Sequence, residues 1–171
     1  GSWLHSTELP ESELLFLPKH KLLQTLREAV DSVDGIESKQ TDEYDASDYD
    51  LIVGCEGMHS PTRDLLLNPL LQKPLPALKS CGYTVFRGNA TTESEITSFQ
   101  TWGSGDNKRF AVVPLSSTRA VWFATVNSNL LAPSSPSSAG AREAVLGHFS
   151  NWHDPVSSLV RSTDEIVVDE A

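Results

Sequence analysis

The sequence is poor in cysteine and in positive charge. Two cysteines in 171 residues do not make a disulfide framework, so a reducing, intracellular setting is expected, the cytoplasm first, with an organelle left open. Both of them, Cys55 and Cys81, are expected to be small buried side chains. Basic residues number 13 against 23 acidic ones, and the net charge of −10 argues against binding a nucleic acid.

Long apolar runs are also missing. No stretch approaches the ~18 consecutive apolar residues of a membrane-spanning helix, so no transmembrane segment is predicted. The chain has no G-x-G-x-x-G turn, the usual cradle for the pyrophosphate of a dinucleotide. The nearest approach, Gly103-Ser104-Gly105, lacks the third glycine and joins two predicted strands instead of opening a helix.

No local pattern assembles a metal site or a catalytic nucleophile. Cys55 and His59 are four residues apart, a spacing that a thiolate–imidazole pair or two metal ligands would use. However, a hydrolase elbow needs glycine two residues before the nucleophile, where Val53 stands, and zinc needs further ligands. The sequence therefore predicts no metal ligand and no catalytic acid or base.

The first half of the chain carries three recognisable local patterns. Apolar residues at 22, 23, 26 and 30 share one helical face, which predicts a helix over residues 18–30. The apolar run 14–17 predicts a short strand, and the acidic stretch 31–49 predicts a solvated loop.

Residues 50–67 predict a strand, a glycine turn and a helix in succession. Residues 51–53 are typical of a buried parallel strand, and Gly57 belongs to the turn that follows it. Ser60 is the expected N-cap of a helix that Asn68-Pro69 ends.

The second half has a different character. Short β-branched and aromatic runs predict four strands of an antiparallel meander, at 81–88, 99–102, 110–115 and 121–127. Turn residues separate these runs at 88–89, 103–107 and 116–117, and a Ser- and Pro-rich loop covers 128–140. Helices are expected over about 141–152 and after Pro155, and residues 166–168 begin a further strand.

Residues 50–63 read D-L-I-V-G-C-E-G-M-H-S-P-T-R. This run resembles the Asp-Gly motif of flavin-dependent aromatic hydroxylases, the para-hydroxybenzoate hydroxylase-type monooxygenases. Cys55 stands where that family usually has alanine. Glu56 stands where it usually has aspartate, which keeps the charge and lengthens the side chain by one methylene.

Further segments are similar to the substrate-domain strands of the same family, so the resemblance covers about residues 14–165. They read G-Y-T-V-F-R-G at 82–88, T-W-G at 101–103, R-F-A-V-V-P-L at 109–115, V-W-F-A at 121–124 and F-S-N-W-H-D-P-V at 149–156. The family's first phosphate-binding motif and its later Gly-Asp motif have no counterpart. The resemblance is therefore to the middle portion of such an enzyme.

The resemblance implies cofactor contacts in the first half of the chain. Lys19 falls where these hydroxylases place an arginine beside the flavin, and Glu56 and Gly57 would lie near the FAD. Arg63 joins this set, anchoring the turn through backbone carbonyls or through Glu56. The alternatives are a solvated Lys19 and an acidic turn residue that caps the helix after Ser60.

Substrate contacts are implied in the second half. Strand alternation puts Tyr83 and Arg87 on one face, from which they would reach the active-site cavity, and the alternative is a solvent-facing arginine. Three aromatic residues of the following strands would wall a hydrophobic substrate cavity in that family, although most aromatics at strand spacing are simply core: Trp102, Phe110 and Trp122.

The patterns and the resemblance together predict an α/β (α+β) chain. It would hold the mixed, largely antiparallel sheet of a flavin monooxygenase substrate domain and a partial FAD-binding segment. The expected parts are a partial FAD-binding segment over 1–67, a connector over 68–80, a substrate-binding-like sheet with helices over 81–165, and a truncated strand over 166–171.

The implied reaction is NAD(P)H-driven hydroxylation or epoxidation of a small apolar or aromatic molecule, with FAD as cofactor. Because both phosphate-binding motifs are absent, a fragment of this kind is expected to be inactive alone. The alternative is a non-catalytic binding or protein-interaction module derived from the same fold. Apolar truncation surfaces left exposed would favour a homodimer or a larger species.

Overall fold

A computed structural model describes residues 2–7, 16–39, 45–71, 78–131 and 140–170. The chain divides into two units, one of Gly1–Gln24 with Ser80–Ala171 and one of Thr25–Lys79, and each is described by itself. The larger unit includes the N-terminal residues because an N-terminal strand pairs with the sheet of the second half.

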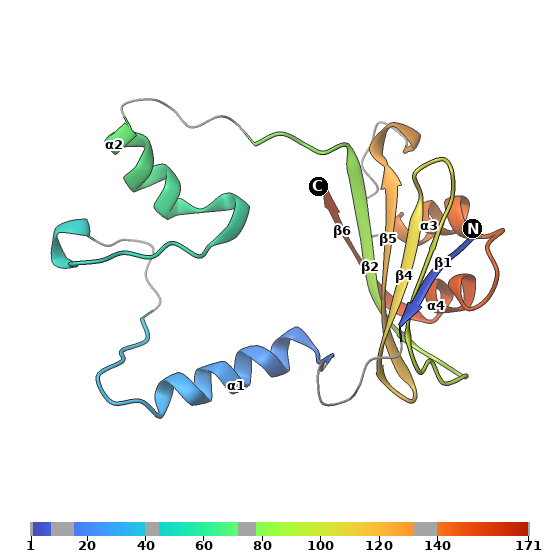
Figure 1. The fold of residues 1–171 in the computed structure, drawn as a ribbon, viewed down its shortest axis with the longest axis horizontal. Helices are drawn as coiled ribbons and strands as arrows, with labels where there is room; N and C mark the ends of the chain where they lie inside the picture. The colour runs from blue at the N-terminus through green and yellow to red at the C-terminus, as the bar shows by residue number, and fades with distance from the viewer. Residues whose placement is uncertain (1, 8–15, 40–44, 72–77, 132–139, 171) are drawn as a thin grey trace. The chain divides into compact units, whose positions relative to one another are not determined.

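One six-stranded antiparallel sheet dominates the larger unit (Figure 1). Its strands follow the order β1-β3-β4-β5-β2-β6, with β1 and β6 at the edges. Their bounds are β1 Ser2–Thr7, β2 Tyr83–Thr91, β3 Phe99–Gly103, β4 Arg109–Ser116, β5 Arg119–Asn127 and β6 Thr163–Glu170. The expected fold class, a mixed α/β chain with a largely antiparallel sheet, is confirmed.

The predicted meander is right for β3, β4 and β5 and wrong for β2. Strand β2 pairs with β5 on one side and with β6 on the other, so it does not neighbour β3. The turn predicted at 88–89 is also wrong, because Gly88 and Asn89 lie inside β2. A Cβ on Gly88 would lie 2.5 Å from Cγ2 of Thr163 and 2.9 Å from the indole of Trp122, so the glycine serves close packing and not a turn.

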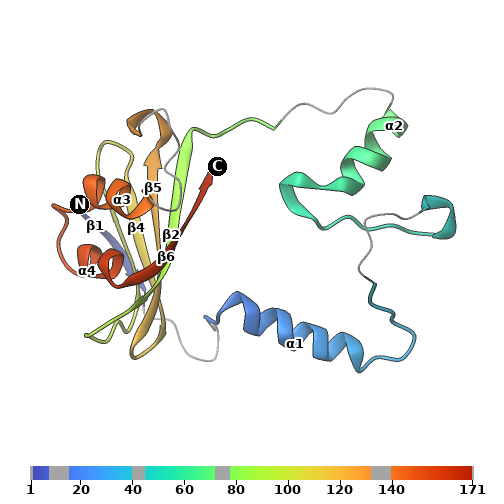
Figure 2. The same ribbon diagram turned by 180° about the vertical axis from the view of Figure 1, so that it is seen from behind.

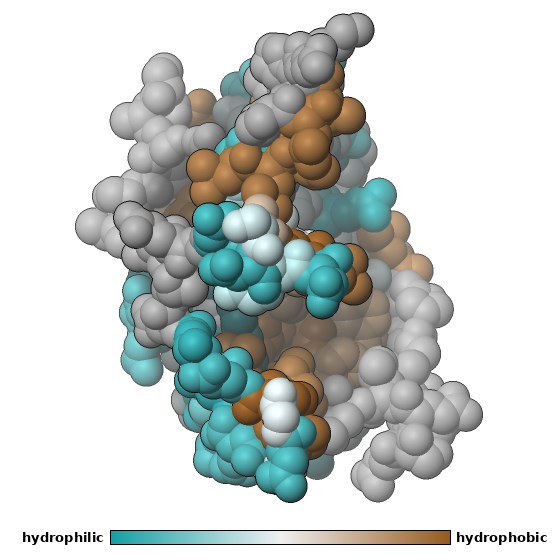
Figure 3. Space-filling view, turned by 90° about the vertical axis from the view of Figure 1, so that its left-hand side faces the viewer, coloured by the Kyte–Doolittle hydropathy of each residue, from teal (hydrophilic) through white to brown (hydrophobic). Residues whose placement is uncertain are grey.

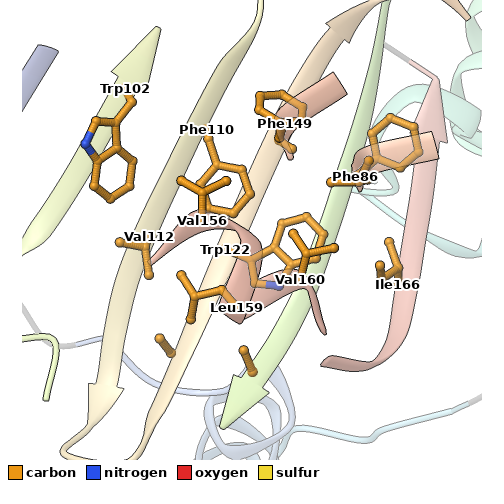
Figure 4. Packing of buried hydrophobic residues seen from close by; sticks show 14 of the residues in the cluster. Phe86, Trp102, Phe110, Val112, Trp122, Phe149, Val156, Leu159, Val160 and Ile166 are labelled. Atoms are coloured by element: carbon orange, nitrogen blue, oxygen red, sulfur yellow. The ribbon is translucent and has the colours of Figure 1, made fainter. Parts of the chain in front are cut away.

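Two helices, α3 (Ala141–Phe149) and α4 (Val156–Arg161), cover one face of the sheet (Figures 1 and 2). Both were expected, although α3 ends before Trp152. The core lies between these helices and the sheet. The alternate residues of β2 and β5 that point to it are fully or almost fully buried, together with side chains from both helices (Figure 4).

The first half of the chain has less regular structure than the sequence predicts. Helix α1 (Lys19–Asp31) is confirmed, but Phe16 and Leu17 are not in a strand, and residues 14–15 lie outside the described residues. Residues 51–53 do not form the predicted strand. A strand needs a neighbour for its backbone N–H and C=O groups, and no described strand pairs with this segment.

The helical residues after Ser60 form a single run that passes through Pro69. It comprises a π-helical turn η3 (Arg63–Leu67) and then α2 (Asn68–Leu71), so the predicted end at Asn68-Pro69 is wrong. Short 3-10 turns occur at η1 (Ala46–Asp48), η2 (Gly57–His59) and η4 (Ser128–Leu130). The predicted N-cap is confirmed, because the Ser60 hydroxyl accepts a 3.2 Å hydrogen bond from the backbone N–H of Arg63.

Apolar side chains of the Thr25–Lys79 unit remain at its surface. None of the described residues of α1, η1, η2 or η3 is buried. Large exposed side chains include Leu26, Leu51, Val53, Met58, Leu65 and Leu70. Figure 3 shows hydrophobic patches on the side that it presents. Both cysteines are exposed too, so the expectation that they are buried is wrong, since neither lies in a packed element. No described helix is long and apolar enough to cross a membrane.

Candidate functional site

The sheet has one face that its own helices leave open. Along β2, Thr84 and Phe86 point to the core, so Tyr83, Val85 and Arg87 point to the opposite face, as the alternation predicts. Helices α3 and α4 pack against the first face only (Figures 1 and 2). The second face, which α3 and α4 leave uncovered, is called the open face below.

Arg87 lies in the middle of a partly apolar row on the open face. It is directly opposite Phe123 of β5 and Val167 of β6, and both of these side chains are more than a third exposed. The guanidinium of Arg87 forms an ion pair with the carboxylate of Asp169, which lies diagonally across from it on the edge strand β6, two residues after Val167. Arg87 thus faces solvent, which was the alternative to a side chain that reaches the active-site cavity. Its guanidinium is already paired with Asp169.

Arg109 is a residue of the open face that is not among the predicted site residues. It opens β4, and Phe110 and Val112 beside it are fully buried on the core side. Its direct neighbour on β5 is Thr125. Among the described residues, no carboxylate lies within ion-pair distance of Arg109. The strand alternation of the R-F-A-V-V run at 109–113 puts Arg109 on the face opposite Phe110, so the sequence does carry a signal for its position.

The three aromatic candidates lie in the core and not on the open face. Trp102, Phe110 and Trp122 are all 0% exposed. Phe110 stacks on Trp122 with ring centres 5.3 Å apart and planes 14° apart, and it meets Phe149 of α3 edge-on (Figure 4). The structure therefore gives them the packing role that was the alternative, and none of them lines the open face.

Glu56 is held by hydroxyl groups of its own turn. Its carboxylate accepts one hydrogen bond from the Ser60 hydroxyl, at 2.7 Å, and another from the Thr62 hydroxyl. These bonds, with Thr62 the larger cause and Ser60 the second, lower the pKa of Glu56 from 4.5 to about 2. Glu56 therefore stays ionised and closes the turn. This is the role of an acidic turn residue that was expected as the alternative to a contact with FAD.

The other predicted cofactor residues are placed as follows. Gly57 has φ of +77°, a left-handed conformation that favours glycine. Arg63 donates a 2.7 Å hydrogen bond to the carbonyl of Met58 and pairs with Asp64 at 3.1 Å, so it anchors the turn through a backbone carbonyl. Lys19 begins α1 and is exposed. The turn residues Glu56, Gly57 and Arg63 lie together, while Lys19 belongs to the other unit.

Two curated proteins match a large part of the chain. The aurachin C monooxygenase/isomerase of Stigmatella aurantiaca is 33% identical over 117 residues, which is 67% of this chain and 28% of that protein. The FAD-dependent urate hydroxylase of Mycolicibacterium vanbaalenii is 29% identical over 120 residues, 68% of this chain and 28% of that protein. The chain thus spans little more than a quarter of the length of the curated relatives that it matches. No protein-family model matches it.

Solved structures show the same fold. HpxO of Klebsiella pneumoniae, complexed with FAD and uric acid, has a TM-score of 0.53 at 23% identity and covers 69% of this chain and 30% of that one. A variant of that enzyme complexed with FAD gives a TM-score of 0.54 at 21% identity, over 68% and 30% of the two chains. The resemblance to flavin-dependent monooxygenases, limited to a portion of such enzymes, is therefore confirmed.

Proposed function

We propose that this chain, whose relatives include an FAD-dependent urate hydroxylase and a second monooxygenase, supplies the substrate-binding sheet of an FAD-dependent monooxygenase. The reaction would be NAD(P)H-driven hydroxylation or epoxidation of a small aromatic or apolar molecule. One observation carries the proposal: the sheet is packed by helices on one face and presents Arg87, Phe123 and Val167 on the other. A ring can lie on such a face, while a guanidinium orients its polar group.

FAD does not fit the described residues of this chain by themselves. A diphosphate needs a cradle of free backbone N–H groups at a helix N-terminus, and the chain has no G-x-G-x-x-G turn to build one. The carboxylate of Glu56, the candidate for a cofactor hydroxyl, is taken up by Ser60 and Thr62. We therefore propose that the isolated chain does not retain FAD and is inactive, and that the sheet contributes to substrate binding in a larger assembly.

A direct test is to mix the purified chain with excess FAD and to desalt it. The proposal expects a colourless protein. Tight, stoichiometric flavin absorbance that NADPH reduces would contradict it, because the chain would then bind and use the cofactor alone.

A second test places the chain in a complete enzyme. The matched segment of the Stigmatella aurantiaca monooxygenase would be replaced by the corresponding residues of this chain. The expected chimaera binds flavin and oxidises NAD(P)H faster when a small aromatic substrate is present. A chimaera that folds and binds flavin but shows no response to a panel of aromatic and apolar compounds would contradict the substrate-binding role.

A non-catalytic interaction module is the second candidate, and one observation favours it. None of the described residues of η1, η2 and η3 is buried, and Leu51, Val53 and Leu70 are each more than two thirds exposed. Exposed apolar side chains, where they gather on a surface, mark interaction sites. We propose that these side chains drive a homodimer or a larger species, and light scattering that shows a monomer at high concentration would contradict this.

A further inference from the structure

Asp169 occupies a position from which it can control the charge of the open face. Its carboxylate pairs with the guanidinium of Arg87, and both side chains are about half exposed, at 47% and 48%. Asp169 lies on β6, an edge strand, directly opposite Val85, and this pair is the next one on the open face after the row that Arg87 shares with Phe123 and Val167. The ion pair therefore lies beside the apolar platform that a ring would contact.

A guanidinium next to apolar side chains is a natural partner for a carboxylate on an aromatic ligand. In this chain the guanidinium already has a carboxylate partner from its own sheet. An anionic ligand must displace Asp169 or share Arg87 with it, and it must also approach the negative charge of Asp169. A neutral ring with the same shape meets neither cost.

We propose that Asp169 is a specificity-determining residue that biases the open face toward neutral aromatic ligands by holding Arg87. The inference rests on the proposed function in one respect only, the assumption that ligands bind to this face. Because the pair is half exposed, water screens it, and its removal shifts anion affinity only a few-fold.

The edge strand also offers a matched control. Glu165 and Asp169 are both acidic and exposed, and both lie on the side of β6 opposite the buried Ile166 and the half-buried Val168. Among the described residues, no ion pair involves Glu165. Glu165→Gln therefore removes the same charge from the same strand and the same face without releasing Arg87, so it separates a specific effect from a general change in surface charge.

The experiment titrates benzoate and benzamide into the 171-residue chain and follows the backbone amide signals of Arg87, Phe123 and Val167 by NMR. The two probes share a ring, and only benzoate carries a charge. We expect Asp169→Asn to tighten benzoate binding by about two- to five-fold and to leave benzamide unchanged, in line with the strength of exposed ion pairs. Glu165→Gln should change benzoate affinity by a clearly smaller factor than Asp169→Asn does, because it alters only the general surface charge.

Arg87→Met completes the design. In an Arg87→Met background, Asp169→Asn should no longer tighten benzoate binding, because the group that it releases is absent. The inference is overturned if Asp169→Asn and Glu165→Gln have equal effects, if benzamide tightens as much as benzoate, or if neither probe perturbs the three amides. If the probes bind but Asp169→Asn and Glu165→Gln change benzoate affinity equally, only the role of Asp169 is contradicted. If neither benzoate nor benzamide binds, the result also counts against the open face as the substrate-binding surface.

Discussion

Trp122 donates a 2.7 Å hydrogen bond from its indole nitrogen Nε1 to the hydroxyl oxygen Oγ1 of Thr163. The same hydroxyl donates a 2.7 Å hydrogen bond to the carbonyl oxygen of Leu159 in α4. Thr163 is only 2% exposed, and Trp122 is fully buried. One hydroxyl thus connects the central strand β5, the end of α4 and the start of β6.

Replacing Thr163 with valine should destabilise the chain. Valine keeps the shape, but it leaves the indole N–H of Trp122 buried without an acceptor, and Leu159 loses its closest donor. We expect the free energy of unfolding to fall by about 1–3 kcal/mol, measured by urea denaturation followed by circular dichroism. Thr163→Ser keeps the hydroxyl and serves as the control; an equal loss in both variants would contradict the hydrogen-bond explanation.

Replacing Gly88 with alanine should also be costly. Its added Cβ would come within 2.5 Å of Thr163 and 2.9 Å of Trp122, and both neighbours are buried. Overpacking of this kind costs about 1–3 kcal/mol, which a shifted denaturation midpoint would show. Gly105→Ala is the matched control, because a Cβ there meets nothing within 4 Å. A Gly88→Ala protein as stable as the control would contradict the close-packing argument.

Arg142 of α3 should be important for the junction between α4 and β6. Its guanidinium donates to the carbonyls of Val160 at 2.7 Å and Arg161 at 3.0 Å, and to those of Thr163 and Asp164. Arg142→Met would leave the helix-end carbonyls without a charged donor. We expect a loss of about 1.5–3 kcal/mol and faster amide hydrogen exchange at residues 159–166.

Two controls test the geometric part of this prediction. Arg142→Lys keeps the charge but not the planar fork, so it should recover only part of the stability. Arg161→Met removes an exposed arginine of α4 and should change the free energy of unfolding by no more than about 0.5 kcal/mol. If Arg161→Met were as harmful as Arg142→Met, the four-carbonyl contact would not explain the loss.

The turn around Glu56 should respond to acid at an unusually low pH. Because the pKa of Glu56 is lowered from 4.5 to about 2, ionisation favours the closed turn. This contribution is present above pH 4.5 and is lost as the pH falls toward about 2. A carbon-13 titration of the Glu56 carboxyl by NMR should give a midpoint near 2, and Thr62→Val should raise it more than Ser60→Ala does. A midpoint near 4.5 in the unmodified chain would contradict the hydrogen bonds of the turn.

Local patterns predicted the elements that depend on local physics. Helix α1 follows from four apolar residues on one face, and the position of Arg87 follows from strand alternation beside Thr84 and Phe86. The N-cap role of Ser60 and the carbonyl contact of Arg63 also follow from residue type and spacing. Each of these features is settled within a few residues of chain.

The errors concern partners that are distant in sequence. Residues 51–53 have the composition of a buried strand, but composition cannot say whether a neighbouring strand is present. Gly88 has the composition of a turn, but its role depends on Thr163 and Trp122, which only the folded sheet brings beside it. The ion pair of Arg87 with Asp169 was missed for the same reason, since the two residues meet only through the β2–β6 pairing.

The place of β2 inside the sheet has a consequence for how the chain must be made. Thr84 pairs with Val126 on one side and with Glu170 on the other, so β2 gains its second neighbour from the far end of the sequence. Pairings between such distant segments form slowly. Until the second partner strand has paired, β2 exposes unpaired backbone N–H and C=O groups to other chains. This unpaired edge can pair with other chains until β6 has docked, so low temperature and dilute conditions should improve the yield of recombinant protein.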